Sequence, residues 1–247
     1  MNRTTSDAII MQVREFGESD LIITFFTPDH GKMKGIAKGA KRSRNRFVNC
    51  LDIFSLVSLD YTIKKKTGLH FINSGKLTDA FPGLRKNYKT LVHASYITEL
   101  TDLLSPWELA DPAMFSMLKD TFRFLAENNN MDIVHVLFEI AAMSLGGFGI
   151  NLEKCCICGR KYTGAGTAVF KPDKGAIACM KCQNITGTTP AMSPETVRAA
   201  VRMQKNFSYD PECVNLSYEA VREIKKVLKL HREYRLEKKP KSGIYID

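Results

Sequence analysis

Four cysteines have the spacing of a metal site. Two C-x2-C pairs are separated by twenty residues, and their members are Cys155, Cys158, Cys179 and Cys182. A C-x2-C turn directs two sulfur atoms to one side, so two such turns supply the four thiolates that Zn²⁺ accepts in a tetrahedron. Four sulfur ligands leave no position open for water. The spacing therefore predicts one structural zinc ion that takes part in no chemistry.

Other uses of these cysteines are less consistent with the sequence. An iron–sulfur cluster stays open as an alternative, because a set of four sulfurs does not by itself select the metal. A thioredoxin-like redox pair would need a single C-x2-C in a βαβ setting. Disulfides are disfavoured because the N-terminal residues carry no secretory signal, which also predicts a cytoplasmic protein. Cys156 has the wrong spacing for a metal turn, and Cys50 and Cys213 are expected to be packed thiols.

The two cysteine pairs need a connection that returns the chain on itself. Residues 168–178 are typical of a β-hairpin with a turn at 173–175. Apolar residues at helical spacing surround this segment. The most apolar stretch, 133–150, contains His135 and Glu139 and ends in glycines, so it predicts a buried helix running into a turn and not a membrane span. The helices expected are 88–104, 112–127, 132–145, one opening at Ser193-Pro194, and 217–236.

The first eighty residues have the pattern of strands. Five short β-rich runs predict a five-stranded barrel of the OB type, with a β-sandwich as the alternative: 8–13, 21–27, 32–38, 53–63 and 69–72. The predicted class is therefore α+β with more than one domain. We expect an OB-type barrel over 1–80 and an α-helical domain over 81–247, with the four-cysteine zinc module inserted at about 150–190.

The charge of the chain favours a polyanionic partner. Its 247 residues carry 36 Lys and Arg against 26 Asp and Glu, a net charge of +10. Residues 32–46 hold seven cations and no acid, namely Lys32, Lys34, Lys38, Lys41, Arg42, Arg44 and Arg46. A solvated loop that aids solubility is the alternative. Basic residues are also in excess in the run Lys64-Lys65-Lys66 and in the segment 222–241.

Within the segment 32–46, strand geometry suggests how the cations reach DNA. Lys32 and Lys34 are two apart and share a face, which Lys38 joins if the register continues. The other four cations belong to the loop after this strand. Together with the strand lysines they are expected to contact successive phosphates of a nucleic-acid backbone. Alanine at both Arg42 and Arg44 should lower the salt slope of DNA binding by ~1 per charge. The candidate aromatics for base stacking are Phe25, Phe26, Phe47 and Tyr61, of which half are expected in the core.

The last helix has a basic stripe at 222, 225, 226, 229 and 232 beside an apolar stripe at 221, 224, 228 and 234. The solvated face of a packed helix is the main interpretation. A second DNA contact or a dock for an acidic peptide is the alternative. No P-loop, H-E-x-x-H motif or nucleophile with a base is present, so the sequence predicts no enzyme.

The chain resembles the RecO family of bacterial recombinational repair mediators. The residues that carry the resemblance are FGESDLIITFFT at 16–27, HGK at 30–32, GIAKGAKRSRNRF at 35–47, LGGF at 145–148 and LEKCCICG at 152–159. It implies an OB domain, a helical domain with a zinc module and no catalytic residues. It also implies binding of single- and double-stranded DNA, strand annealing, and help to the recombinase in displacing single-strand-binding protein.

The partners that the resemblance implies are RecR, RecF and the acidic tail of single-strand-binding protein. Some members of the family lack the cysteines, so the metal is predicted from this sequence alone. Cysteines and charge by themselves equally permit a zinc-ribbon adaptor for transcription or RNA binding. A metalloenzyme would need an open position on the metal.

Overall fold

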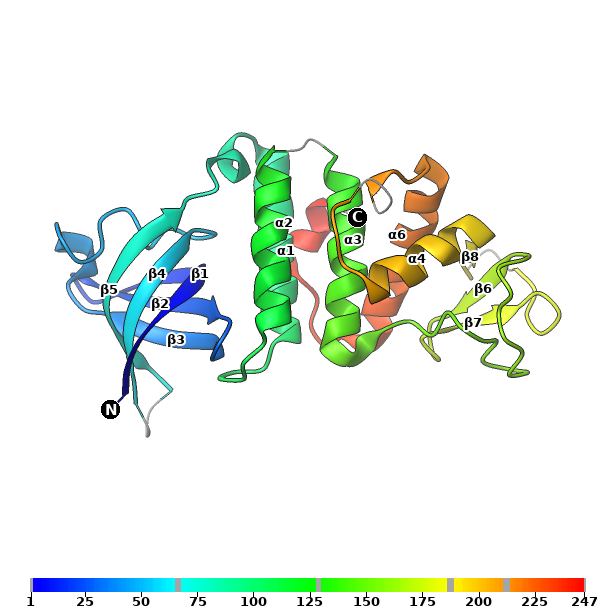
Figure 1. The fold of residues 1–247 in the computed structure, drawn as a ribbon, viewed down its shortest axis with the longest axis horizontal. Coiled ribbons are helices and arrows are strands. Elements are labelled where there is room, and N and C mark those ends of the chain that lie inside the picture. The colour runs from blue at the N-terminus through cyan, green and yellow to red at the C-terminus, as the bar shows by residue number, and fades with distance from the viewer. Residues whose placement is uncertain (1, 65–67, 128–129, 186–188, 211–213, 247) are drawn as a thin grey trace. The chain divides into compact units, whose positions relative to one another are not determined.

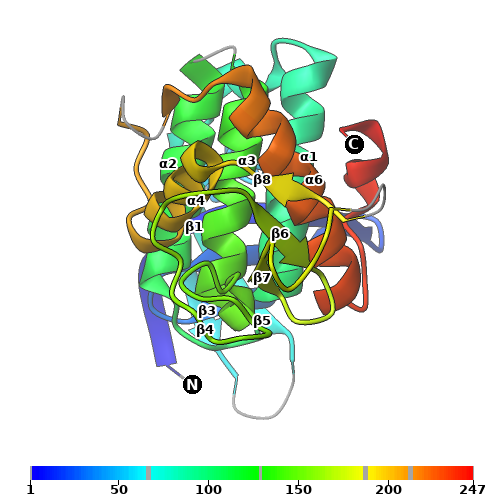
Figure 2. The same ribbon diagram turned by 90° about the vertical axis from the view of Figure 1, so that its right-hand side faces the viewer.

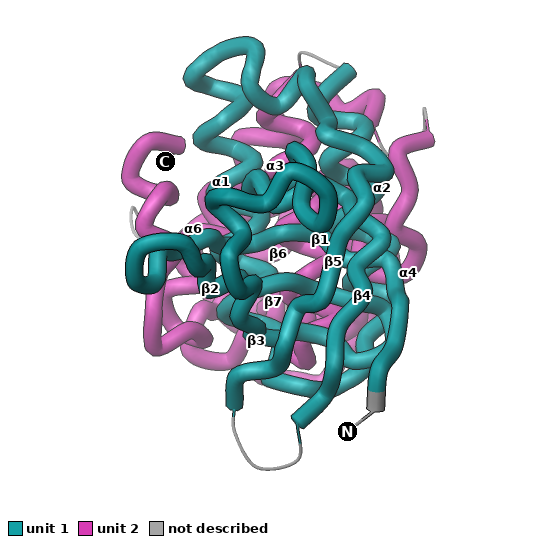
Figure 3. The backbone as a smooth tube through the Cα atoms, turned by 90° about the vertical axis from the view of Figure 1, so that its left-hand side faces the viewer, with its two compact units in different colours: residues 1–127 teal, residues 128–247 magenta. Residues whose placement is uncertain are grey.

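The computed structural model describes residues 2–64, 68–127, 130–185, 189–210 and 214–246. The chain forms two compact units, residues 1–127 and 128–247 (Figure 3). Lys65, Lys66 and Cys213 lie outside the described residues, so the expectations for them are not taken further.

The first unit contains a closed barrel of strands in the order β1-β2-β3-β5-β4 (Figure 1). The five predicted strands are confirmed and the sandwich is excluded. Neighbouring strands are antiparallel except β3 and β5, which are parallel. In that pair Gly35 lies opposite His70 and Ile36 lies opposite Phe71. The strands span Asn2–Phe16 (β1), Asp20–Thr27 (β2), Gly31–Ala37 (β3), Leu56–Ile63 (β4) and His70–Asp79 (β5).

Alternating residues of these strands fill the barrel. Phe25, Met33 and Tyr61 are at most 1% exposed and belong to one apolar cluster. β1 pairs with both β2 and β4, and a register shift interrupts its pairing with β2 between Ile10 and Gln12. In β3 the core residues Met33 and Ala37 are odd-numbered, which places Lys32 and Lys34 on the other face.

Two helices pack on the barrel within the first unit, α1 (Tyr88–Leu104) and α2 (Pro112–Glu127). Each begins where a side chain caps its first turn: Asn87 accepts from the amide of Thr90, and Asp111 accepts from the amide of Met114 at 2.9 Å. Rings of the two layers meet, with Phe26 of β2 stacked on Phe115 of α2. The domain boundary expected after residue 80 stays a prediction.

The second unit is built on helices and a small sheet (Figure 2). The hairpin expected at 168–178 is present, and a third strand extends its sheet to the order β7-β6-β8. Apolar side chains from the helices and the sheet share one core. The elements are α3 (Met131–Met143), β6 (Ala168–Lys171), β7 (Ala176–Cys179), β8 (Ala191–Met192), α4 (Pro194–Lys205) and α6 (Tyr218–Arg235).

Helix α3 is the predicted buried apolar helix. By length and composition, residues 131–148 are apolar enough to cross a membrane. Every residue of the helix from Ile133 to Met143 is buried among the helices and sheet of its own unit, as in the core of a globular domain. The helix ends in a π turn over Ser144–Phe148, where Gly147 adopts a φ of 83°.

A buried ion pair links α3 to α6. Arg232 Nη1 lies 2.8 Å from Glu139 Oε1, and His135 Nε2 lies 3.1 Å from Glu139 Oε2. The expectation that Arg232 belongs to a solvated stripe is therefore wrong, because its side chain is 5% exposed. Tyr234, placed by its spacing on the apolar stripe, is 62% exposed. A step of six residues from Leu228 turns the helix by about 600°, so Tyr234 points about 120° away from the buried side.

Candidate metal centre and nucleic-acid interface

The structure brings the four spaced cysteines together. The sulfur atoms of Cys155, Cys158, Cys179 and Cys182 all lie within 4.8 Å of one another. The Sγ atoms of Cys158 and Cys179 are 3.9 Å apart. A tetrahedral ion with sulfur at ~2.3 Å requires its ligands to be about 3.8 Å apart, so the donor set fits a tetrahedral metal ion. Cys156 is exposed and lies outside this set.

Backbone pairing positions the two cysteine turns. The hairpin register opposes Ala168 to Cys179, which ends β7 and begins the second turn. The first turn is bound to β7 because the amide of Cys156 donates to the carbonyl of Ile177 at 2.8 Å. It closes through Gly159, whose φ of 74° favours glycine. The hairpin thus returns the second pair to the first, as its spacing predicts.

The thiols of the cluster influence the protonation of one another. Burial alone raises the pKa of Cys155, but amides including those of Cys158 and Cys179 outweigh it and lower the pKa to about 6. Hydrogen bonds with the thiols of Cys158 and Cys179 raise the pKa of Cys182 to about 12. Four thiolates side by side would repel one another, so Cys182 keeps its proton without a cation, and binding of a divalent metal ion releases it.

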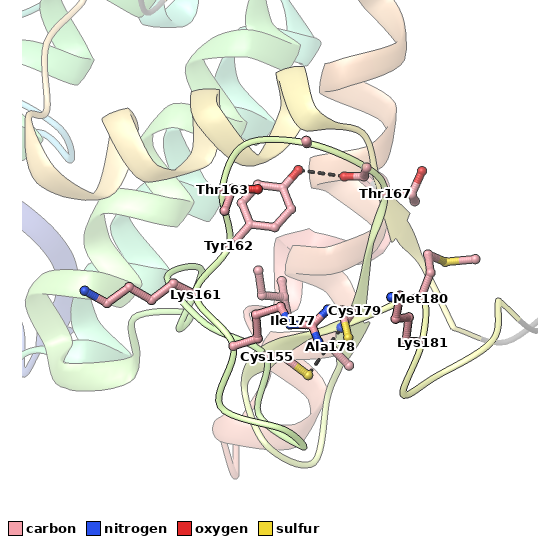
Figure 4. Close-up of a pocket in the computed structure, with 13 residues that line it drawn as sticks. Cys155, Lys161, Tyr162, Thr163, Thr167, Ile177, Ala178, Cys179, Met180 and Lys181 are labelled. Atoms are coloured by element: carbon pink, nitrogen blue, oxygen red, sulfur yellow. Dashed lines mark hydrogen bonds between the residues drawn. The ribbon is translucent and has the colours of Figure 1, made fainter.

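A cavity of about 240 Å³ adjoins this centre (Figure 4). Tyr162 borders it and donates its hydroxyl to the carbonyl of Gly166 at 2.8 Å, which closes the loop on one side. The amide of Cys179 donates to Cys155 Sγ at 3.4 Å. Lys161 extends away from the sulfur atoms, so its charge does not serve the metal centre.

The seven cations of residues 32–46 do not share one environment. Lys32 is 5% exposed: its ammonium lies 3.1 Å from Asp102 Oδ1 of α1 and 4.5 Å from the ring centroid of Trp107. A buried, paired lysine is not available to a phosphate. Lys32 therefore holds the α1–α2 connection against β3 and is not part of a phosphate-binding surface.

Two cations of the following loop have acidic partners. Lys41 Nζ lies 2.8 Å from Glu15 Oε2, and Arg42 Nη2 lies 3.8 Å from Glu18 Oε2. Glu15 lies near the end of β1, and Glu18 lies in the turn between β1 and β2. Both pairs are exposed on at least one side, so water weakens them and a phosphate can compete for the cations.

Of the remaining four cations, Lys38 lies over an aromatic ring on the outer face of the barrel. Lys34 is half-buried, while Lys38, Arg44 and Arg46 are exposed. Arg46 is fixed by donating to the carbonyl of Lys38 at 2.7 Å. Phe71 of β5 lies opposite Ile36 of β3 and is half-buried, with Lys38 Nζ at 5.4 Å and Lys64 Nζ at 3.5 Å from its centroid. We call these residues the outer basic face: Lys34, Lys38, Arg44, Arg46, Lys64 and Phe71.

The structure corrects the prediction of which aromatic residues stack on bases. Phe25, Phe26 and Tyr61 are fully buried and Phe47 is 6% exposed, so none of the four presents a ring face to a base. Phe71 was missed. Its signal is present in the sequence, because Ile72 is a core residue of the barrel and strand alternation then turns Phe71 outward.

The chain therefore combines a barrel with a basic outer face and a helical unit that carries a four-cysteine cluster. Family models support the same two-part organisation: "Recombination protein O N terminal" matches residues 1–81 and "Recombination protein O C terminal" matches residues 85–243. Together they cover nearly the whole chain. The protein belongs to the RecO family of bacterial DNA repair proteins.

Curated relatives carry the same name, DNA repair protein RecO. The protein of Syntrophobacter fumaroxidans is 36% identical over 72% of this chain and 71% of its own length. That of Syntrophus aciditrophicus is 30% identical over 98% of this chain and 94% of its own. That of Desulfatibacillum aliphaticivorans is 31% identical over 98% of this chain and 95% of its own length.

Proposed function

We propose that this protein is a non-catalytic mediator of DNA repair and recombination. It binds single- and double-stranded DNA, anneals complementary strands and assists recombinase loading onto DNA coated by single-strand-binding protein. RecR, RecF and the acidic tail of single-strand-binding protein are its partners in the bacterial cytoplasm. The observation that carries the proposal is the outer basic face, where Lys38 and Lys64 lie against the outward ring of Phe71 on an OB-type barrel that also bears exposed arginines.

The mechanism is electrostatic. Cations that contact phosphates release the counterions condensed on DNA, which gives affinity without sequence preference. When two strands are neutralised in this way, their mutual repulsion falls and complementary bases can meet. Lys34, Lys38 and Arg44 supply the charge, and none of them forms an ion pair with an acid of the described residues. Lys41, Arg42 and Arg46 join them at the loop.

Phe71 is expected to distinguish single strands from duplexes, because only an unpaired base offers its face for stacking. Phe71→Ala should lower the affinity for a single-stranded oligonucleotide about tenfold, within the ~1–3 kcal/mol that one stacked base contributes. Phe71→Tyr, which keeps the ring, is the matched control. Fluorescence anisotropy with labelled oligonucleotides measures both. Equal losses for single strand and duplex would show that the ring does not stack.

An annealing assay tests the proposed function as a whole. Complementary strands coated with single-strand-binding protein are mixed with the full chain, and duplex formation is followed by fluorescence. A mediator accelerates duplex formation, and alanine at Lys34 and Arg44 reduces that acceleration. A zinc-ribbon adaptor of transcription or RNA binding would leave the rate unchanged, and that result would overturn the proposal.

We also propose that the cysteine cluster holds one structural Zn²⁺. The ligands are Cys155, Cys158, Cys179 and Cys182, and the ion stabilises the fold of the module at about 150–190. In this proposal the OB domain spans 1–80 and the helical domain 81–247. Elemental analysis of the purified protein should give one zinc per chain. Iron with a visible absorption band would assign the cluster to iron and sulfur.

A further inference from the structure

The second unit contains a groove that neither the metal centre nor the outer basic face uses. It has a volume of about 730 Å³ and runs between the first cysteine turn and helix α4. Its apolar floor is made by Leu152, Val197 and Val201, with the ring of Tyr162 beside them. All of its lining residues belong to the second unit.

Exposed cations line both walls of this groove. Arg198 and Arg202 are four residues apart on α4, so they stand about 6 Å apart along its axis on one side of the helix. Lys154 and Lys161 face them from the cysteine module, where a β-bridge joins these two residues. Among the described lining residues Glu153 is the one acid, and Lys205 lies 3.7 Å from it. The groove is therefore strongly positive.

Backbone contacts keep the walls in place. The amide of Tyr162 donates to the carbonyl of Glu153 at 2.7 Å, and the amide of Cys155 donates to the carbonyl of Arg160 at 2.9 Å. These bonds fix the module wall on which Lys154 and Lys161 stand. The guanidinium of Arg198 donates to the carbonyl of Gly164 across the groove at 3.4 Å. Arg198 thus reaches from α4 to the module wall, on which Lys154 and Lys161 stand.

We propose that this groove binds a second polynucleotide strand, distinct from the strand on the barrel. A strand presents a phosphate at every nucleotide, which suits cations distributed along two walls better than cations gathered at one point. Arginine presents a planar fork of donors that matches phosphate oxygens. The apolar floor and the Tyr162 ring accommodate bases. The inference rests on the proposed function, since annealing brings two strands to one protein.

Variants of each wall test this site in the full chain. Arg198→Ala with Arg202→Ala should slow annealing of naked complementary strands about tenfold. Affinity for a first single strand should change less than about threefold, because the outer basic face is intact. Lys154→Ala with Lys161→Ala should act in the same way from the opposite wall. Lys174→Ala with Lys238→Ala removes the same charge from exposed positions outside the groove and should anneal like the wild type.

Photo-crosslinking gives a readout that charge alone does not produce. An oligonucleotide carrying 5-iododeoxyuridine should crosslink to Tyr162, as mapped by mass spectrometry, and the arginine double variant should lose this crosslink. If both wall variants anneal like the control and Tyr162 is never crosslinked, the inference is wrong. The arginine double variant is also tested for binding of a labelled glutamate-rich peptide. If it no longer binds that peptide but anneals strands like the wild type, the groove belongs to a protein ligand instead.

The two proposals fail in different ways. If the outer face is not the DNA site, alanine at Lys34 and Arg44 leaves first-strand affinity unchanged whatever the groove variants do. If only the groove inference is wrong, those outer-face substitutions still weaken binding while the groove variants leave annealing unaltered.

Discussion

Serine at Cys158 is expected to release the metal ion and unfold the cysteine module. Structural zinc contributes about 10–16 kcal/mol of apparent binding free energy, and that energy becomes folding energy where the site does not exist without metal. Losing one of four ligands removes most of it. The sulfur atoms stand within 4.8 Å of one another, so a single missing ligand opens the site. Metal content and the thermal unfolding of the full chain measure the effect.

The chain provides a matched control for this substitution. Cys156 is exposed, lies two residues from Cys158 and is outside the cluster, so Cys156→Ser should keep both the metal and the melting temperature. DNA binding by the outer basic face should survive in both variants, because that face belongs to the other compact unit. Equal metal content in the two variants would show that Cys158 is not a ligand.

Alanine at Arg232 should cost about 3–5 kcal/mol of the free energy of unfolding, because it removes the arginine cation that lies 2.8 Å from the buried carboxylate of Glu139, whose other oxygen contacts His135. The side chains of Arg232 and Glu139 are 5% and 1% exposed. The exposed pair of Lys239 and Glu233 is the comparison, and Lys239→Ala should cost ~0–1 kcal/mol. Urea denaturation of the full chain measures both values.

Removing both charges separates the penalty of an unpaired ion from a loss of packing. Arg232→Met combined with Glu139→Gln leaves no unpaired charge and should recover much of the stability. A double variant as unstable as Arg232→Ala would mean that the arginine acts through its packing. Similar stabilities for Arg232→Ala and Lys239→Ala would contradict the buried ion pair itself.

Local patterns carry enough information to predict the elements. Ser193 and Ser217 are predicted to open helices, and each accepts a hydrogen bond from an amide three residues ahead. The hairpin at 168–178 follows from its turn residues. The cysteine cluster is predictable because ligand spacing is itself a local property. Strand alternation could have identified Phe71, whose neighbour Ile72 faces the core.

The missed features depend on partners distant in the sequence. Lys32 has the same residue type and strand parity as Lys34, yet Asp102 lies seventy residues away and covers only the first of them. Glu139 lies 93 residues from Arg232, so nothing near α6 indicates that this cation is buried. A single sequence shows which faces are apolar, but it does not show which charged residue meets another.

The salt dependence of DNA binding tests the central claim most directly. The dissociation constant for a single-stranded oligonucleotide is measured between about 50 and 200 mM salt for the wild type and for Lys34→Ala with Arg44→Ala. Each phosphate contact contributes about 0.7 to the logarithmic slope, so the double variant should lose about 1.4. Lys174→Ala with Lys238→Ala should keep the wild-type slope. Identical slopes for all three proteins would contradict a phosphate-binding role for the outer basic face.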